Sequence, residues 1–198
     1  MYESPERQRL HELLHSSKIV TGGFMGDDHR ELPQIIEEDK FKLSKYNLTI
    51  KKVAERMQAI TDQAIKGLGN WVDIDDKSRA MADEVKGSLI CPWPHEGKFF
   101  KRVTYFYRKD LDEKIKWSDL SIHMIAAHGF FQGKGATFRI DPDQLVHFIF
   151  DIKKKPDKEK KKDLKSYRCL MCSYIYDPED NNDIAFDQLP DEWVCPIC

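Results

Sequence analysis

Four cysteines near the carboxyl end of the sequence carry its clearest chemical signal. They form two C-x-x-C pairs, Cys169 with Cys172 and Cys195 with Cys198, on either side of residues 173–194. A C-x-x-C turn places two sulfurs on one side of a tight loop, and two such loops facing each other arrange four thiolates as a tetrahedron. Tetrahedral four-sulfur sites select zinc or iron. The spacing therefore predicts one metal ion bound by these four cysteines, without deciding between the two metals.

A second group of potential ligands lies in the middle of the chain. Cys91 and His95 stand in CPWPH, and His123 and His128 stand in HMIAAH. Two ligands from a strand edge and two from a helix are the arrangement of zinc-finger-like sites. Against this, His123 and His128 are five positions apart, which corresponds to a rotation of ~140° around a helix. Their side chains would therefore point in different directions from the helix axis. Two interpretations stay open, a zinc site and an unrelated set comprising a buried cysteine, a core histidine and a histidine at a helix C-terminus.

A third motif, HELLH at 11–15, matches the H-E-x-x-H pattern of zinc proteases. In that pattern His11 and His15 bind zinc and Glu12 acts as the general base, and His29 or Glu37 could supply a third ligand. Short motifs of this kind recur by chance, and an amphipathic helix with a solvated face accounts for the same residues. A zinc hydrolase is therefore the least favoured of the functional hypotheses.

The sequence pattern of the segments that must position these residues predicts a mixed α+β domain at 1–152. Helical periodicity, N-caps at Thr49, Ser118 and Asp141, and terminating glycines predict helices at 5–17, 33–46, 50–66, 119–128 and 141–150. The second and third helices should form a helical hairpin over 33–67. Runs of β-branched and aromatic residues predict a small antiparallel sheet, which with its helices occupies 80–150 and has strands at 84–90, 98–108 and 113–117.

The composition is that of a soluble globular protein. Apolar residues make up 40% of the 198 residues, charged residues make up 33%, and the formal net charge is −2. This near balance indicates neither nucleic-acid nor membrane binding, and no apolar run reaches the ~18 residues of a membrane span. The first residues lack the basic start and apolar core of a signal peptide. We expect a cytoplasmic protein, in which paired cysteines usually mark metal or redox chemistry.

The charged residues divide the rest of the chain into a basic segment and an acidic one. Residues 153–165 contain eight lysines and three acidic residues, which predicts an extended charged linker because such a segment cannot bury enough apolar surface to fold. Residues 166–198 form a small module with one base, Arg168, against seven acids: Asp177, Glu179, Asp180, Asp183, Asp187, Asp191 and Glu192. This acidic module suits a partner protein with a basic surface. Equally, the lysines of the linker could neutralise the charge of the module.

The module resembles rubredoxin. The segments YRCLMCSYIYDP and FDQLPDEWVCPIC contain both cysteine pairs, YDP at 176–178 and the run LPDEWVCP. The resemblance covers Tyr167–Cys198 and implies that the four cysteines hold one iron atom, rather than zinc, for one-electron transfer. It also implies an aromatic core beneath the metal, made by Tyr167, Tyr176, Phe186 and Trp193.

These observations lead to three functional hypotheses. The first is a one-electron carrier, in which the body at 1–152 either docks a partner or is the redox client of the module. The second is a non-redox interaction protein whose zinc sites only support its structure, and the third is the hydrolase with HELLH. No flavin, haem or nucleotide motif identifies a client, and the motifs leave open whether the protein is an enzyme.

Overall fold

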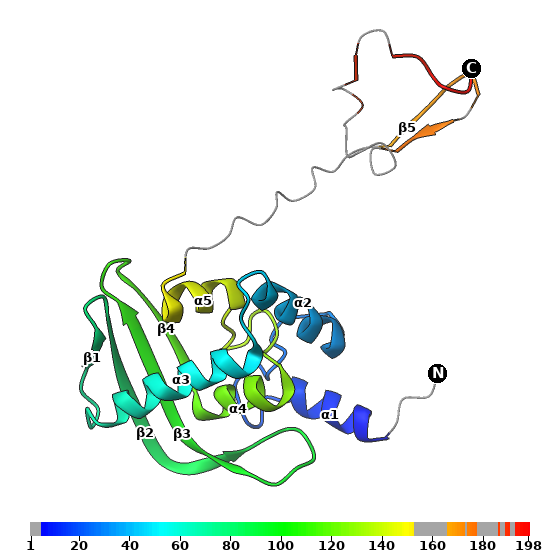
Figure 1. The fold of residues 1–198 in the computed structure, drawn as a ribbon. Helices are drawn as coiled ribbons and strands as arrows, with labels where there is room; N and C mark the ends of the chain where they lie inside the picture. The colour runs from blue at the N-terminus through cyan, green and yellow to red at the C-terminus, as the bar shows by residue number, and fades with distance from the viewer. Residues whose placement is uncertain (1–4, 153–165, 173, 178–185, 187–188, 191–192) are drawn as a thin grey trace. The chain divides into compact units, whose positions relative to one another are not determined.

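The computed structural model describes residues 5–152, 166–172, 174–177, 186, 189–190 and 193–198 (Figure 1). The chain divides into two compact units, the body (Met1–Lys154) and a C-terminal unit (Lys155–Cys198) that contains the module. The predicted linker at 153–165 lies outside the described residues. The same holds for Pro178 of the YDP sequence and for six of the seven acids of the module, Asp177 being the exception.

A four-stranded antiparallel sheet is the framework of the body. Its strands are neighbours in chain order and comprise β1 (Val72–Asp75), β2 (Ser78–Ile90), β3 (Lys98–Arg108) and β4 (Glu113–Ser118). Strand β4 pairs only with Val103–Arg108 of β3, so the far half of the β2–β3 hairpin continues beyond it (Figure 1). A bulge between Val85 and Ser88, with Gly87 at φ 116°, interrupts the β2–β3 register, and bulges of this kind bend the strand that contains them.

Strands β3 and β4 begin at the predicted residues, whereas the first half of the sheet differs from the prediction. Strand β1 was not predicted, and β2 begins at Ser78 rather than at residue 84. The early part of β2 contains small and charged residues with little strand propensity. It is held in the sheet by its pairing with β3, where Ala80 and Ala82 lie opposite Phe106 and Thr104 on the buried face. Tertiary contacts therefore override local preference here.

Five helices are present in the described part of the body, and they agree closely with the predicted positions. They are α1 (Pro5–His15), α2 (Leu32–Ser44), α3 (Ile50–Ile65), α4 (Asp119–His128) and α5 (Pro142–Phe150). Thr49 and Ser118 accept backbone N–H groups as N-caps of α3 and α4, as predicted, and Gly129 ends α4 at φ 66°. Helices and antiparallel sheet together confirm the α+β class.

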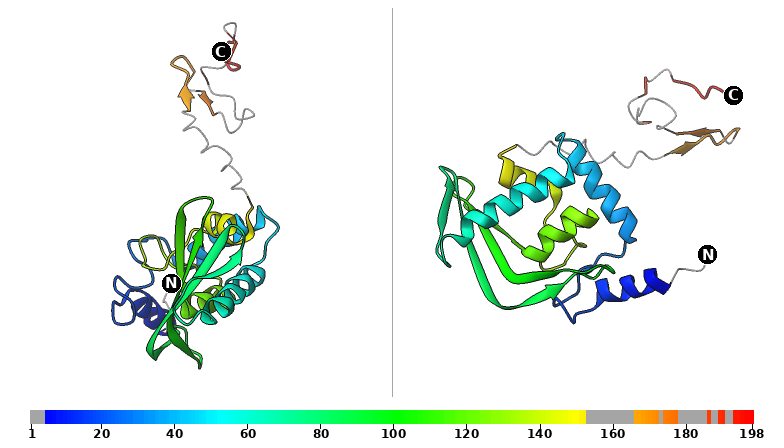
Figure 2. Two further views of the ribbon diagram at one scale, coloured as in Figure 1. Left: turned by 90° about the vertical axis from the view of Figure 1, so that its left-hand side faces the viewer. Right: turned by 60° about the horizontal axis from the view of Figure 1, so that its bottom comes forward.

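The packing of these helices differs from a simple hairpin over 33–67. Helix α3 packs mainly against α4 and β2, whereas α2 packs mainly against α5. Helices α3 and α4 lie side by side on one face of the sheet (Figure 2). Helix α3 packs in this way because one side of it is an apolar stripe that is buried against the sheet and α4. The stripe consists of Val53, Ala54, Met57, Ile60 and Ala64.

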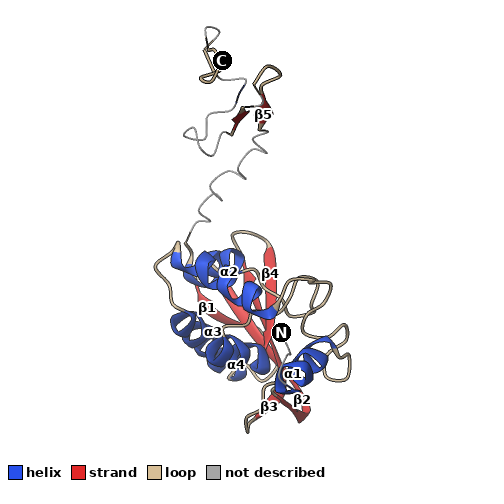
Figure 3. Ribbon diagram, turned by 90° about the vertical axis from the view of Figure 1, so that its right-hand side faces the viewer, coloured by secondary structure: helices blue, strands red, loops and turns tan. Residues whose placement is uncertain are grey.

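A second apolar cluster lies away from the centre of the sheet, where α1, α2 and α4 meet the end of β2. It contains Leu14, Phe24, Met25, Ile35, Cys91, Leu120, Met124 and Phe130. Figure 3 shows α1 beside the ends of β2 and β3. This cluster buries Cys91 and so anchors the segment between the two strands.

Two buried carboxylates hold the loops of the body. The side chain of Asp28 accepts hydrogen bonds from Arg30 and from the backbone N–H of Lys134, which joins two distant loops. Asp39, only 1% exposed, pairs with Arg139, whose Nη2 lies 2.7 Å from Asp39 Oδ1.

Among the described residues no helix has the length and apolar character needed to cross a membrane.

The module contains a short antiparallel pair, β5 (Tyr167–Arg168) and β6 (Ile175–Tyr176), on either side of the first cysteine pair. Beneath it lie the four aromatic residues that the resemblance implies. The rings of Tyr167 and Phe186 stack at 4.4 Å between centroids, and Trp193 meets Tyr176 and Phe186 edge-on at 5.4 and 5.5 Å. Tyr176 is buried and the others are partly exposed.

Candidate metal centres

In the module, the four cysteine sulfurs lie close together. Each Sγ is within 4.8 Å of the other three, with 3.7 Å between Cys169 and Cys198 and 3.5 Å between Cys172 and Cys195. All four are free thiols. Metal–thiolate bonds of ~2.3 Å in a tetrahedron require sulfurs ~3.8 Å apart. The cage therefore has the dimensions of a mononuclear four-thiolate site.

The backbone of each cysteine pair points N–H groups at sulfur in the same way. Cys169 receives hydrogen bonds from the N–H groups of Cys172 and Met171, and Cys195 receives them from Ile197 and Cys198. The two C-x-x-C loops thus form equivalent turns around their sulfurs. The first is closed by the N–H of Cys169, which donates to the carbonyl of Tyr174 at 2.8 Å.

The surroundings of the four thiols, including the other sulfurs, shift their pKa values. The backbone donors lower the pKa of Cys169 to about 6, whereas the neighbouring sulfurs of Cys172 and Cys169 raise the pKa of Cys198 to about 12. Four thiolates at these distances repel one another strongly unless a cation lies between them. The cage is therefore suited to a positively charged ion between the sulfurs rather than to four unbound thiolates.

An apolar rim surrounds the cage. It consists of Leu170, Met171, Val194 and Ile197, which are between 67% and 99% exposed. Sequence reasoning did not single out these residues, although three of them stand inside the C-x-x-C pairs and Val194 directly precedes Cys195. Exposed apolar groups beside an accessible metal site are suited to a docking contact with another protein.

In the body, the structure also brings together the four predicted ligands of the second group. Cys91 directly follows β2, His95 lies in the connection to β3, and His123 and His128 come from α4. Their ligand atoms all lie within 4.8 Å of one another. His95 Nε2 is 3.1 Å from the Nε2 atoms of both His123 and His128, and Cys91 Sγ is 3.4 Å from His128 Nε2.

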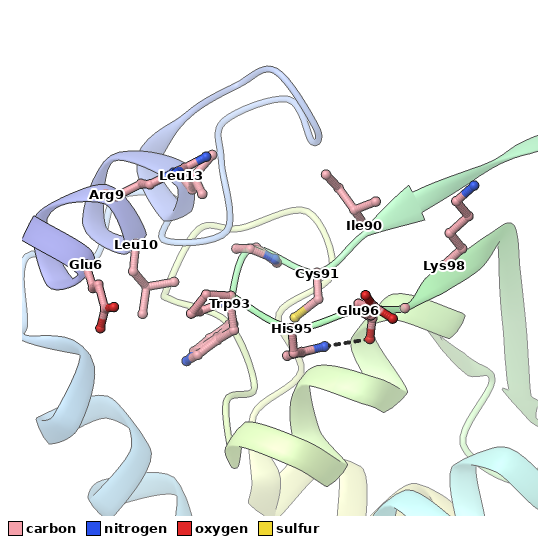
Figure 4. Close-up of a pocket in the computed structure, with 13 residues that line it drawn as sticks. Glu6, Arg9, Leu10, Leu13, Ile90, Cys91, Trp93, His95, Glu96 and Lys98 are labelled. Atoms are coloured by element: carbon pink, nitrogen blue, oxygen red, sulfur yellow. Dashed lines mark hydrogen bonds between the residues drawn. The ribbon is translucent and has the colours of Figure 1, made fainter.

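Neighbouring groups orient the three imidazoles. His95 Nδ1 donates a hydrogen bond to the carbonyl oxygen of Glu96 at 2.9 Å, drawn as a dashed line in Figure 4. The His128 ring stacks on Trp93 with 4.0 Å between centroids and 5° between planes, and the His123 ring stacks on Phe99 at 4.2 Å. Burial lowers the pKa of His128 to about 4 and also lowers that of His123. Their imidazoles are therefore neutral at pH 7.

In the part of the chain that the structure describes, the HELLH motif forms no comparable cluster. His15 Nδ1 bonds to the backbone carbonyl of His11 within α1, and the two rings lie 4.1 Å apart. His29 lines a surface pocket that His11 and His15 also line. Within the described residues, however, His11 and His15 do not converge with any third potential ligand, His29 and Glu37 included.

Comparisons with known proteins assign the module. The family model described as rubredoxin matches residues 166–198. Rubredoxin-1 of Chlorobaculum tepidum is 45% identical over 40 residues, which cover 17% of this chain and 58% of that protein. Rubredoxin-2 of the same organism is 40% identical over 42 residues, 18% of this chain and 81% of that protein. Probable Rubredoxin-1 of Methanocaldococcus jannaschii is 37% identical over 41 residues, 17% of this chain and 51% of that protein.

The chain therefore belongs to the rubredoxin family through its C-terminal module, which confirms the resemblance. It spans a little over half the length of the first relative named. Membership implies an iron site formed by four cysteines, and the module has the cage to hold it. No solved structure matches the chain.

Proposed function

We propose that the protein is a cytoplasmic one-electron carrier that binds iron through Cys169, Cys172, Cys195 and Cys198. The observation that carries this proposal is the convergence of four free sulfurs, at a tetrahedral spacing, in a module of the rubredoxin family. An iron ion bound there would supply a ferric/ferrous couple. No substrate bond needs to form or break, so the protein's part is to hold the sulfurs and control their surroundings.

The residues of the cage serve electron transfer in two ways. The short C-x-x-C turns, backed by the aromatic core, fix the sulfurs so that little rearrangement accompanies a change of oxidation state. The backbone N–H groups aimed at Cys169 and Cys195 stabilise the more negative, reduced site and so raise its reduction potential.

The surface of the module suggests the kind of partner. Exposed Leu170, Met171, Val194 and Ile197 bring an apolar contact close to the cage, and the module has seven acids against one base. We infer a redox partner protein whose docking surface has an apolar patch surrounded by basic residues. The positive charges of such a surface would attract the acidic module and speed the formation of the complex. The body would either dock that partner or be the client itself.

A redox titration of the full chain, purified without added metal, tests the proposal. We expect an iron-dependent visible absorption that bleaches with dithionite, returns in air, and follows a one-electron Nernst curve. The absorption should disappear in Cys172→Ser/Cys195→Ser and persist in the control Cys91→Ser, which removes a cysteine of the body. A colourless protein with only zinc in the cage would refute electron transfer.

That colourless outcome would favour the second hypothesis, an interaction protein with structural zinc in both clusters, because the same tetrahedral cage also accepts zinc. The hydrolase hypothesis is separately testable. Glu12→Gln would abolish any metal-dependent hydrolysis found in a substrate screen, whereas unchanged hydrolysis would exclude Glu12 as its general base.

A further inference from the structure

The geometry points to a structural zinc centre in the body, formed by Cys91, His95, His123 and His128, that fastens the β2–β3 connection to helix α4. This inference is independent of electron transfer in the module. It concerns ligands that come from two segments far apart in the sequence, residues 91–95 and 123–128. Figure 4 shows Cys91 and His95 within the connection that follows β2.

Hydrogen bonding alone does not account for the contacts among these side chains. The Nδ1 proton of His95 is directed at the Glu96 carbonyl, so in this tautomer the ring presents one lone pair at Nε2. That lone pair faces two other Nε2 atoms, each 3.1 Å away. If the Cys91 thiol donates to His128 Nε2 at 3.4 Å, the lone pairs of His128 and His95 meet with no proton between them. One divalent cation would accept all four lone pairs at once.

The distances agree with those around zinc. Zn–N bonds of ~2.05 Å and Zn–S bonds of ~2.3 Å in a tetrahedron require N···N separations of ~3.3 Å and N···S separations of ~3.6 Å. The observed values are 3.1, 3.1 and 3.4 Å. A mixed set of imidazoles and one thiolate is borderline in softness, which suits zinc better than hard cations such as magnesium or calcium.

The surroundings supply the support that metal ligands need. The Glu96 carbonyl sets the tautomer of His95, and stacking on Trp93 and Phe99 sets the rings of His128 and His123. Metal-binding histidines commonly have their second nitrogen held by a carbonyl in this way. Cys91 is 6% exposed and His95 is exposed, so the ion would lie between the core and the surface.

Four protein ligands leave no coordination position for a water molecule or a substrate. Zinc sites of this kind are structural, whereas catalytic zinc keeps an open position. The segment 91–97 contains two prolines and a glycine at φ 151°, and its internal backbone hydrogen bond runs from the N–H of His95 to the carbonyl of Trp93. The zinc ion would therefore contribute to the stability of the body by joining this segment to the C-terminal end of α4.

Zinc analysis of the full chain in a Cys172→Ser/Cys195→Ser background tests the inference, because that background removes the cage of the module. We expect one zinc ion per chain, and none after His95→Ala/His123→Ala is added, together with a lower melting temperature. The matched control His11→Ala/His15→Ala removes two histidines of the body and should keep its zinc. Zinc lost in this control, or kept in His95→Ala/His123→Ala, would overturn the assignment.

Cobalt substitution gives a second measurement that does not depend on a histidine variant folding. Co²⁺ bound in the same background should show tetrahedral d–d bands and a charge-transfer band from one thiolate, and Cys91→Ser should abolish the charge-transfer band alone. A spectrum of octahedral cobalt, or a charge-transfer band that survives Cys91→Ser, would contradict the proposed ligand set.

Discussion

The module should unfold when its metal cage is broken, while the body stays folded. In Cys172→Ser/Cys195→Ser the two remaining sulfurs cannot hold a tetrahedral ion. Structural metal binding in small modules contributes on the order of 10 kcal/mol to folding. The apolar core beneath the cage cannot replace this, because Tyr176 alone among its four aromatic residues is buried. A buried aromatic side chain contributes ~1.5–3 kcal/mol, and units below ~40 residues usually need a metal or disulfide.

Amide NMR spectra of the diamagnetic zinc-loaded full chain and of the variant would measure this directly. We expect the dispersed signals of residues 167–172, 174–177 and 193–198 to collapse to random-coil positions in the variant, while signals from 5–152 remain. The matched control Cys91→Ser should leave the module signals unchanged. Module amides that stay dispersed and protected from exchange without metal would refute the view that metal binding drives its folding.

Three further predictions concern the body. Arg139→Met should destabilise it by ~3–5 kcal/mol in urea unfolding, because it leaves the buried Asp39 carboxylate unpaired; a cost below ~1 kcal/mol would contradict this. Asp28→Asn should cost ~1–3 kcal/mol at pH 7. The Arg30 guanidinium lowers the pKa of Asp28, so that contribution is present above about pH 4 and lost as pH falls below it; a variant as acid-sensitive as the parent would contradict the assignment. Gly26→Ala should lower the melting temperature, because a Cβ would lie 2.3 Å from a backbone nitrogen at a φ of 57°; an unchanged value would contradict it.

The convergence of the four cysteines in the module could be predicted from sequence because each pair is local. A C-x-x-C pair determines its own turn, so the spacing of Cys169, Cys172, Cys195 and Cys198 was enough to expect the cage seen here. The apolar rim could not be derived in this way. Exposure of Leu170 and Val194 depends on how the two turns face each other, which no single-segment pattern specifies.

The cluster in the body shows where helical periodicity misleads. A separation of five residues argued against joint ligation by His123 and His128, yet both rings reach His95 with α4 intact through His128. The long imidazoles converge on a residue from another segment rather than on one face of the helix. The early part of β2 and the packing of α2 against α5 likewise depended on long-range pairing, which local propensity does not contain.

X-ray absorption at the iron edge of the purified full chain tests the central claim most directly. If the module carries electrons through a four-thiolate iron, the first shell should contain four sulfurs at about 2.3 Å, the length of a metal–thiolate bond. The same shell should persist after reversible one-electron reduction. Nitrogen or oxygen neighbours in that shell, or iron absent from a cage filled by zinc, would contradict the account.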